Sequence, residues 1–287
     1  MTVTKFLQNE PMSRHTSFKI GGPADYLALP TTADELINLW NTCKKDGTPL
    51  TILGDGQNVL VSDEGIRGVV ALTNKMDKIS LDGEKIHADA GVRLSALAEA
   101  ACSASLAGLA FASGIPGTVG GAIYMNAGAY GHDIQEFIES VTLFVNGEII
   151  VKSCEEMGFG YRKSIVQNGE MLILDAVFKL SKGDSSEIRE EMKDLMNRRR
   201  KTQPLEFHSA GSFFKRPEGH FAGKLIEDSG LKGFSVGDAQ VSEKHAGFVV
   251  NRGNATAKDV LELMNHVTAT VFEKYGVKLE PEVQILG

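Results

Sequence analysis

The sequence predicts a two-domain α+β protein. Its 287 residues suffice for about two domains of ordinary size. Apolar residues make up 42% of the chain and charged residues 23%, which is the composition of a folded globular protein. Strand-like and helix-like stretches alternate up to a long helical segment that ends before Pro204. We therefore place the main boundary near residues 204–208.

The first region begins with a predicted helix. Thr32 and Glu35 fit a capping box, and apolar residues then recur at helical spacing. This face consists of Leu36, Ile37, Leu39, Trp40 and Cys43. Short strands are expected at 50–53, 59–61 and 69–72, and an alternating strand through Ile86, Ala88 and Ala90. An alanine-rich helix over about 94–106 follows.

A β-hairpin comes next. Residues 141–145 and 148–152 flank Asn146-Gly147, which is the strongest short hairpin signal. A further strand is expected over 172–180 and a helix over 184–201.

The second region is shorter. A helix is expected over about 222–229, a strand over 247–251 and a longer helix over 256–275, which Gly276 ends. The tail, 277–286, alternates like a strand. Its apolar face consists of Val277, Leu279, Val283 and Ile285, and its polar face of Glu280, Glu282 and Gln284.

A glycine-rich run over 114–131 is the most informative segment. Six of its eighteen residues are glycine, and it lacks the charges of a solvated linker. Glycine lets the backbone approach a ligand closely, and main-chain amides can cradle a pyrophosphate. We expect a loop wrapped around a flat or phosphorylated ligand; the alternative is a pair of tight turns in a buried loop.

The segment Gly54-Asp55-Gly56-Gln57-Asn58 follows a predicted strand, as a dinucleotide-binding turn would. The Rossmann fingerprint fails, because Val59 replaces its third glycine and a strand-like VLV follows instead of a helix. Two interpretations of this segment are left: a polar strand–turn–strand that presents main-chain amides to phosphate, and a plain turn.

Composition and charge exclude several classes. The net charge of −7 argues against a nucleic-acid binder. The three cysteines form no CxxC pair and the histidines no HxxxH pair, so neither a disulfide framework nor a metal site is expected. No signal-like segment or membrane-length apolar run is visible, so we expect a cytoplasmic protein.

Four polar side chains are candidates for chemistry, and each also has a structural interpretation. Arg162, beside Tyr161, could clamp a carboxylate, or pair with a surface glutamate. Ser212 lies between Gly211 and two phenylalanines, so it is either a satisfied core hydroxyl or a placed proton donor. Glu282 could be functional or solvated, and His245 is more typical of a core or capping residue.

The order of these motifs carries a resemblance over nearly the whole chain. They are GDGQNVLVSD, GIPGTVGGA, NAGAYG, YRKS, GSFFK, HAGFVVN and EPEV. The set resembles the UDP-N-acetylenolpyruvoylglucosamine reductase family, flavoenzymes of peptidoglycan precursor synthesis. The resemblance implies an FAD-binding region of the vanillyl-alcohol-oxidase (PCMH) type over 17–183 and a C-terminal substrate domain over 206–287. Residues 1–16 would be an N-terminal segment and 184–205 a connecting helix.

The resemblance also implies where FAD binds. Two glycine-containing segments would hold the pyrophosphate, and a third would continue the flavin site. The implied residues are Gly54, Asp55, Gly56, Gln57, Asn58, Val59 and Leu60; Gly114, Ile115, Pro116, Gly117, Thr118, Gly120, Gly121 and Ala122; and Asn126, Gly128, Ala129 and Tyr130.

The family's catalytic trio corresponds to Arg162, Ser212 and Glu282. The resemblance implies that NADPH reduces the flavin, which then gives hydride to C3 of UDP-N-acetylglucosamine enolpyruvate. Arg162 would clamp the carboxylate and stabilise charge at C2. Ser212 would protonate C2, and Glu282 would support the enolic intermediate or relay a proton.

Two departures leave the substrate contacts open. Arg216 stands where asparagine is common, and the short stretch between Arg162 and Ser212 matches the shorter subclass, which lacks a tyrosine-bearing loop. The candidates for substrate contacts are Lys215, Lys224, Arg199, His245 and Asn251. We expect a monomer. The alternatives are another FAD oxidoreductase on this scaffold and a non-enzymatic nucleotide-binding module.

Overall fold

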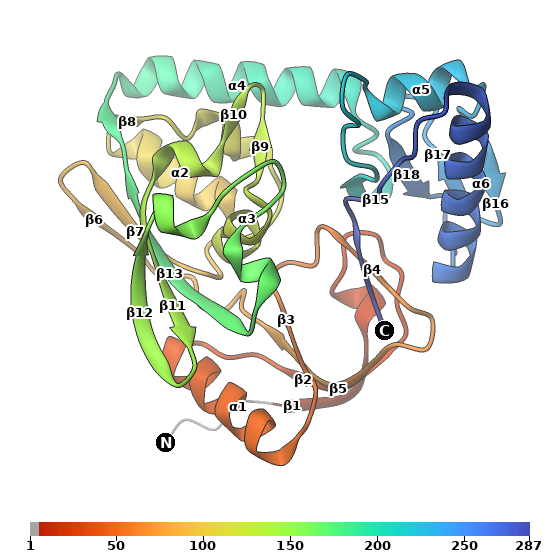
Figure 1. The fold of residues 1–287 in the computed structure, drawn as a ribbon. Helices are drawn as coiled ribbons and strands as arrows, with labels where there is room; N and C mark the ends of the chain where they lie inside the picture. The colour runs from red at the N-terminus through yellow and green to blue at the C-terminus, as the bar shows by residue number, and fades with distance from the viewer. Residues whose placement is uncertain (1–5) are drawn as a thin grey trace. The chain divides into compact units, whose positions relative to one another are not determined.

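The computed structural model describes residues 6–287, so the first five residues of the expected N-terminal segment lie outside it (Figure 1). The chain divides into two compact units. Unit 1 holds the chain up to Leu7, 27–55 and 69–199, and unit 2 holds 8–26, 56–68 and 200–287. The predicted domain ranges are continuous, whereas unit 2 draws two pieces from the N-terminal part.

A five-stranded antiparallel sheet forms the centre of unit 1, in the order β12-β11-β13-β7-β6. Its strands are β6 (Ile79–Asp82), β7 (Lys85–Asp89), β11 (Ile138–Val145), β12 (Glu148–Ser153) and β13 (Met171–Lys179). The predicted hairpin is confirmed, with Val145 paired to Glu148. Asn146 and Gly147 have φ of 52° and 88°, as the tight turn of a two-residue hairpin requires.

Helix α1 (Ala33–Asp46) lies at the turn end of the β11–β12 hairpin (Figure 1). The Thr32 hydroxyl accepts the Glu35 N–H at 3.2 Å, as the capping box predicts. The Glu35 carboxylate accepts instead from the Thr31 N–H at 2.8 Å, one residue earlier than the box requires. The apolar face of α1 packs against the sheet through Leu36, Leu39 and Cys43, which meet Phe144, Leu172 and Leu174.

Helix α2 (Leu94–Ser103) is shorter than predicted, and the expectation of a helix to about 106 is wrong. Ser105 has a φ of 56°, which ends the helix, and Leu106 starts a strand. That strand, β8 (Leu106–Ala107), pairs with β14 (Ser181–Lys182).

We expected the glycine-rich run to be a continuous loop, and this is wrong. The run contains helix α3 (Val119–Met125). The Thr118 hydroxyl caps the helix by accepting the Gly121 N–H. A Cβ at Gly120 would lie 3.1 Å from the carbonyl oxygen of Ala90, so a small residue there permits close packing. Two short strands follow, β9 (Gly128–Ala129) and β10 (His132–Asp133).

The predicted strand–turn–strand after residue 50 is confirmed. Strand β3 (Leu50–Leu53) leads through the turn into β4 (Val59–Val61), and no helix follows. Strand β3 pairs in parallel with β5 (Ile66–Leu72) through Leu50–Val69 to Leu53–Leu72. With β1 (Phe6–Pro11) and β2 (Pro23–Ala28) these form a sheet of order β1-β2-β5-β3.

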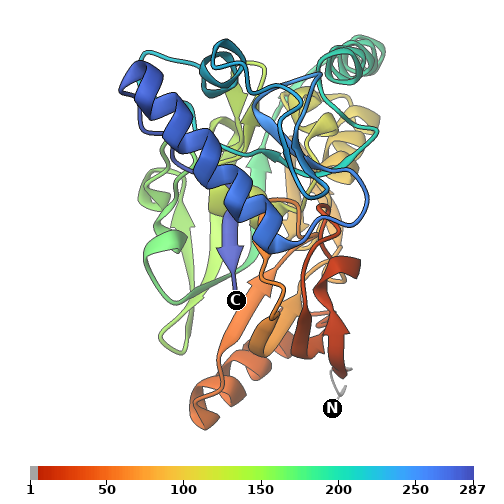
Figure 2. The same ribbon diagram turned by 90° about the vertical axis from the view of Figure 1, so that its right-hand side faces the viewer.

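Unit 2 contains a four-stranded antiparallel sheet of order β15-β18-β17-β16. Its strands are β15 (His208–Ser212), β16 (Ser235–Val236), β17 (Ala239–Val241) and β18 (Phe248–Asn251). Helix α5 (Ala222–Asp228) and the long helix α6 (Ala257–Tyr275), blue in Figure 2, pack with them. A capping box of Thr256 and Asp259 starts α6, and Gly276 ends it with φ of 67°.

The tail of the chain forms less strand than predicted. Only β19 (Gln284–Leu286) is a strand, and it pairs in parallel with β4. Pro281 interrupts the pattern because it has no N–H to donate. Leu279 and Val283 are buried as predicted, whereas Ile285 is 44% exposed.

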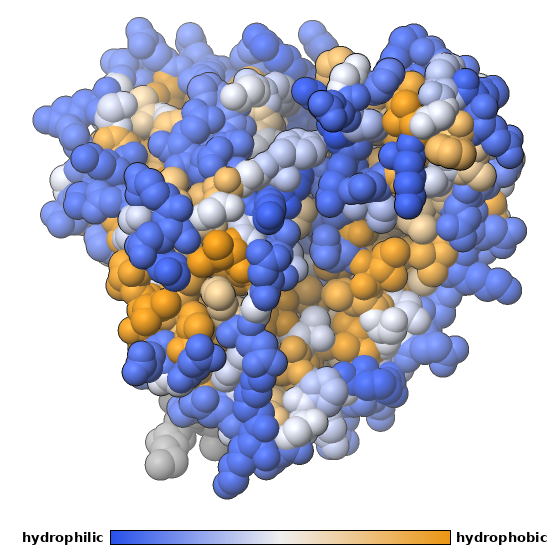
Figure 3. Space-filling model, viewed as in Figure 1, coloured by the Kyte–Doolittle hydropathy of each residue, from blue (hydrophilic) through white to orange (hydrophobic). Residues whose placement is uncertain are grey.

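Helix α4 (Ser185–Thr202) carries the chain from unit 1 into unit 2. Its surface is mainly polar, as the top of Figure 3 shows, and Ile188 and Leu195 are its buried residues. Short 3₁₀ turns complete the fold: η1 (Met12–Arg14), η2 (Ala110–Gly114), η3 (Ile134–Phe137), η4 (Glu155–Met157) and η5 (Ile165–Asn168). Within residues 6–287, no helix is both long and apolar enough to cross a bilayer.

Candidate functional site

The start of the polar turn packs directly on the glycine-rich run. A Cβ on Gly54 would lie 2.1 Å from the Thr118 hydroxyl oxygen, so only glycine fits between them. Asp55 is held by two side chains: its carboxylate accepts from Arg93 at 2.9 Å and from Asn74 at 3.3 Å. Two of the predicted cofactor segments therefore meet within unit 1.

The rest of the turn belongs to unit 2 and offers mainly its backbone. Gly56 has φ of 61°, and a Cβ there would lie 2.2 Å from the His15 carbonyl oxygen. The Ser17 hydroxyl donates to the Gln57 carbonyl at 3.3 Å. Val59 and Leu60 are buried in β4. Any contact that these last two residues make with a cofactor would come from their main chain.

Two glycines of the run have no internal reason to be glycine. A Cβ at Gly121 would meet only the Thr118 hydroxyl, at 3.6 Å, and one at Gly114 would meet nothing nearer than 3.7 Å. Neither has a positive φ that would demand glycine. By contrast Gly117, between the exposed Pro116 and the buried Thr118, has φ of 126°. A Cβ would thus make only ordinary contacts at Gly114 and Gly121, and close approach of a bound group such as FAD would account for glycine at both positions.

Arg162 is fixed against the end of this run. Its guanidinium donates to the carbonyl oxygens of Asn126 at 3.2 Å and Gly128 at 3.0 Å, and it lies 5.1 Å from the Tyr161 ring centre. Its φ of 54° is unusual for a residue other than glycine. Such strain persists where surrounding contacts hold it and is frequent at functional sites.

Asn126, whose carbonyl accepts from Arg162, also makes hydrogen bonds through its side chain. It is fully buried, with φ of 41° at the end of α3. Its side chain donates to the Gly160 carbonyl at 3.0 Å and accepts from the Gln135 N–H at 3.2 Å. Both the nitrogen and the oxygen of the side-chain amide therefore bond to the main chain of the protein, so the Asn126 side chain stabilises the conformation of the loop.

The last turns of α4 also contact the run. The Tyr130 hydroxyl donates to the Leu195 carbonyl at 3.0 Å, although its ring is 44% exposed. Arg199 donates to the carbonyl oxygen of Gly114, and burial lowers the pKa of its guanidinium. We predicted Arg199 as a substrate residue; in the structure it lies beside the cofactor segment that contains Gly114. Ile115 and Ala129 are half-buried neighbours, and Ala122 is buried.

Ser212 ends strand β15 in unit 2, and its side chain is exposed. The interpretation of Ser212 as a satisfied core hydroxyl is therefore wrong. The next two residues, Phe213 and Phe214, are buried with their rings edge-to-face at 5.3 Å. They anchor the strand end, so the hydroxyl is fixed by its neighbours while it faces solvent.

Glu282 lies on the segment next to Ser212. Its N–H donates to the Phe213 carbonyl at 2.8 Å, and Phe214 forms a bridge with Pro281. Its own carbonyl accepts from the Asn58 side chain at 3.1 Å. Two of the three predicted catalytic residues are thus brought onto adjacent main-chain segments of unit 2. The alternation of the tail gave no hint of this pairing.

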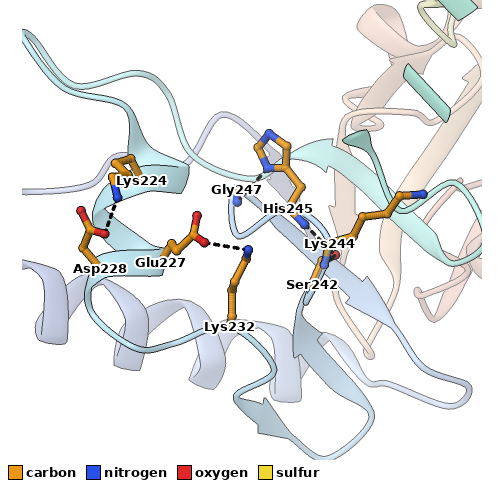
Figure 4. A network of polar contacts seen from close by, with 8 residues as sticks. All are labelled: Lys224, Glu227, Asp228, Lys232, Ser242, Lys244, His245 and Gly247. Carbon is orange, nitrogen blue, oxygen red and sulfur yellow. Dashed lines mark hydrogen bonds and ion pairs between the residues drawn. The ribbon is translucent and has the colours of Figure 1, made fainter. Parts of the chain in front are cut away.

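The lysine candidates of unit 2 are both in ion pairs. Lys224 pairs with Asp228 at 2.6 Å on one turn of α5, as Figure 4 shows, and Lys215 lies 3.7 Å from Glu280. Both ammonium groups are partly exposed, so each pair is weak and could open for an anionic ligand.

His245 and Asn251 are more enclosed. The His245 Nδ1 accepts the Gly247 N–H at 3.1 Å (Figure 4), and burial lowers the pKa of its ring. Asn251 is buried; its side chain donates to the Phe18 carbonyl and accepts from the Gly253 and Ala255 N–H groups. These contacts describe a structural role for Asn251.

Comparisons with known proteins identify the family. An FAD binding domain model matches residues 24–152, and the model of the UDP-N-acetylenolpyruvoylglucosamine reductase C-terminal domain matches residues 203–286. A reductase of that name from Caldanaerobacter subterraneus subsp. tengcongensis is 52% identical over 284 residues, covering 99% of this chain and 94% of that protein. The chain belongs to the UDP-N-acetylenolpyruvoylglucosamine reductase family.

Further relatives agree with this assignment. The reductase of Clostridium novyi is 52% identical over 277 residues, covering 96% of this chain and 90% of that one. The crystal structure of the Thermus caldophilus reductase superimposes with a TM-score of 0.85 at 37% identity, and the match covers both chains completely. The expected α+β fold, with an FAD-binding region and the reductase family's C-terminal domain, is confirmed, as is FAD as the expected cofactor.

Proposed function

We propose that this chain reduces UDP-N-acetylglucosamine enolpyruvate to UDP-N-acetylmuramate with NADPH, as a step of peptidoglycan precursor synthesis. Membership of the reductase family over nearly the whole chain supports the activity. The observation that supports the mechanism best is the hydrogen bond from the Glu282 N–H to the Phe213 carbonyl, which fixes Glu282 next to Ser212. Bound FAD would supply hydride transfer from NADPH to C3 of the enolpyruvyl group.

Arg162 would bind the substrate carboxylate and stabilise the negative charge that develops at C2. Its guanidinium has five donors in a rigid fork, and two of its bonds reach Asn126 and Gly128. A guanidinium held by main-chain carbonyls is preorganised, so no reorientation is needed when charge appears.

Ser212 would donate its hydroxyl proton to C2 and regain a proton from solvent. The hydroxyl is exposed at the end of β15, where a substrate can reach it. Glu282 would support the enolic form or relay the proton, since its carboxylate is carried by the adjacent segment. A positioned proton donor of this kind is typically worth about 10²–10⁴-fold in rate.

FAD would be held by the main chain of the turn 54–60 and of the segment 114–122, with 126–130 completing the flavin site. The absence of a steric clash for a Cβ at Gly114 or Gly121 supports this assignment, because a bound cofactor would then be what requires glycine there. Lys215, Lys224 and His245 would contribute to binding the sugar nucleotide, because they belong to the same unit as Ser212 and offer positive or hydrogen-bonding groups. NADPH and nucleotide sugars are cytoplasmic metabolites, so we place the activity in the cytoplasm, with the monomer as the catalytic unit.

Anaerobic stopped-flow absorbance tests this proposal. NADPH should bleach the flavin, and UDP-N-acetylglucosamine enolpyruvate added afterwards should restore its colour within a turnover. A protein that is bleached but not reoxidised by this substrate would be another flavin oxidoreductase. A colourless protein that takes up no FAD would be a nucleotide-binding module.

A further inference from the structure

The polar turn contacts the end of the chain through both the side chain and the main chain of Asn58. Its Nδ2 donates to the Glu282 carbonyl at 3.1 Å, and its main-chain carbonyl accepts from the Gln284 N–H at 2.9 Å. Asn58 therefore forms hydrogen bonds with the residues on both sides of Val283. A residue that was expected at the cofactor uses its side chain on a proposed catalytic segment instead.

The side-chain bond of Asn58 lies just outside the regular pairing of β4 with β19. The parallel pairing of β4 with β19 starts at Val59 and Gln284 and runs toward the C-terminus. Glu282 lies before the first of these pairs, in a stretch that Pro281 keeps out of regular structure. The Asn58 amide extends the hydrogen bonding by one further bond, to the residue that carries the carboxylate.

The Glu282 residue is thereby fixed at both its peptide groups. Its N–H donates to the Phe213 carbonyl at 2.8 Å, and its carbonyl receives the Asn58 amide. Phe213 in turn donates its N–H to the Gly247 carbonyl at 2.8 Å. Without the Asn58 side chain, the Glu282 N–H keeps its bond to the Phe213 carbonyl, and the Glu282 carbonyl keeps the side-chain amide of its near neighbour Gln284 at 3.2 Å.

We infer that Asn58 is a positioning residue: its side-chain amide sets the place of Glu282 relative to Ser212. This rests on the proposed function, in which Glu282 and Ser212 serve substrate reduction. A shift of about 1 Å in such a group can cost roughly 100-fold in rate. Asn58 acts through the main chain of Glu282, so its effect falls on substrate reduction and spares the reduction of flavin by NADPH.

The test compares the two half-reactions of the FAD-loaded Asn58→Ala protein in anaerobic stopped flow. We expect reoxidation by the enolpyruvyl substrate to slow at least tenfold, with bleaching by NADPH and FAD content within twofold of wild type. Gln240→Ala is the matched control, because the Gln240 amide also donates to a main-chain carbonyl of unit 2, that of Gly233 at 3.1 Å. That control should leave both half-reactions unchanged.

A double variant decides whether Asn58 acts through Glu282. Adding Asn58→Ala to Glu282→Gln should slow reoxidation by less than twofold beyond Glu282→Gln alone. Multiplication of the two single effects, equal slowing of both half-reactions, or loss of FAD would overturn the inference. Should Asn58→Ala not fold, Asn58→Ser, with a shorter donor, takes its place with the same criteria.

Failure of the proposed function gives a different result. If Glu282→Gln reoxidises as fast as wild type, then Glu282 has no part in the reaction and the role of Asn58 falls with it. If Glu282→Gln is slow and Asn58→Ala is as fast as wild type, only the role of Asn58 is overturned.

Discussion

At the scale of single residues, the most telling side chain is Arg162. Predicted as a carboxylate clamp or a partner of a surface glutamate, it also donates to the carbonyls of Asn126 and Gly128 in the glycine-rich run. The left-handed φ of Arg162 and that of Asn126 occur together at this contact. The chain therefore accepts backbone strain where it fixes a cationic group beside the glycine-rich run.

Arg162→Lys tests the need for the fork. A single ammonium cannot reproduce two guanidinium bonds to Asn126 and Gly128 together with a bidentate bond to a carboxylate. We expect substrate reduction to slow by about 10²-fold, the scale of one lost transition-state donor. Flavin reduction by NADPH should change little. The exposed neighbour gives the control, since Lys163→Ala should keep both rates; equal rates for Arg162→Lys and wild type would refute the role.

Asp89 gives a pH-dependent prediction at the same scale. Burial raises the pKa of its carboxyl, and Asp175, its partner on β13, adds to this rise. Because the folded-state pKa lies above the unfolded one, the folded state binds more protons, and this contribution to stability is lost as pH rises through the folded pKa. The unfolding free energy of wild type relative to Asp89→Asn should thus increase as pH falls from 7 toward 4. Urea titrations of both proteins that stay parallel over this range would contradict it.

The sequence motifs were a better guide to the candidate functional residues than to the contacts that those residues make. Arg162, Ser212 and Glu282 were singled out from residue types and order. The bonds of Asn58 to the tail join positions more than 200 apart in sequence, as the separation of 224 shows. No local pattern encodes such a pairing. The exposure of Ser212 likewise depends on its place at the end of β15. Its apolar sequence neighbours gave no indication of that exposure.

At the scale of elements, signals that depend on local geometry were read correctly. The Asn146-Gly147 hairpin and the Gly276 end of α6 both require a specific backbone conformation that few residues adopt. Helix α3 was missed because glycine disfavours a helix. Tertiary packing overrides that preference here, since a Cβ at Gly120 would lie only 3.1 Å from the Ala90 carbonyl oxygen.

Two adjacent glycines of α3 should respond differently to alanine. Gly120→Ala places a Cβ 3.1 Å from the Ala90 carbonyl oxygen and should destabilise the apoprotein by about 1–3 kcal/mol. Gly121→Ala meets only the Thr118 hydroxyl, at 3.6 Å, so apoprotein stability should hold or rise. FAD should bind the Gly121→Ala protein about tenfold more weakly, which is 1.4 kcal/mol. Thermal unfolding of the apoproteins and flavin fluorescence titration measure the two effects; unchanged FAD affinity in Gly121→Ala would remove this glycine from the cradle.

At the scale of the whole molecule, the predicted boundary and the observed units differ in kind. The end of the long helix before Pro204 suggested a break near 204–208, whereas unit 2 also takes in 8–26 and 56–68. Such discontinuity arises from pairings like that of β4 with β19, which periodicity cannot reveal. The turn 54–60 consequently contributes to both units.

FAD should stabilise the folded protein. A ligand that binds only the folded protein adds about 2.7 kcal/mol at 100 times its dissociation constant. For a chain of this size that corresponds to a rise in Tm of roughly 5 °C. Differential scanning fluorimetry of apoprotein across an FAD titration measures the shift, with riboflavin, which lacks the pyrophosphate, as the control. A shift as large with riboflavin would contradict a main-chain pyrophosphate cradle.

The most direct test of the account is the rate of flavin reoxidation in Ser212→Ala. Anaerobic stopped flow should show bleaching by NADPH at the wild-type rate, because Ser212 takes no part in that step. Reoxidation by UDP-N-acetylglucosamine enolpyruvate should slow by about 10²–10⁴-fold, since C2 then lacks its proton donor. Reoxidation at the wild-type rate would contradict the claim that this exposed hydroxyl completes the reduction.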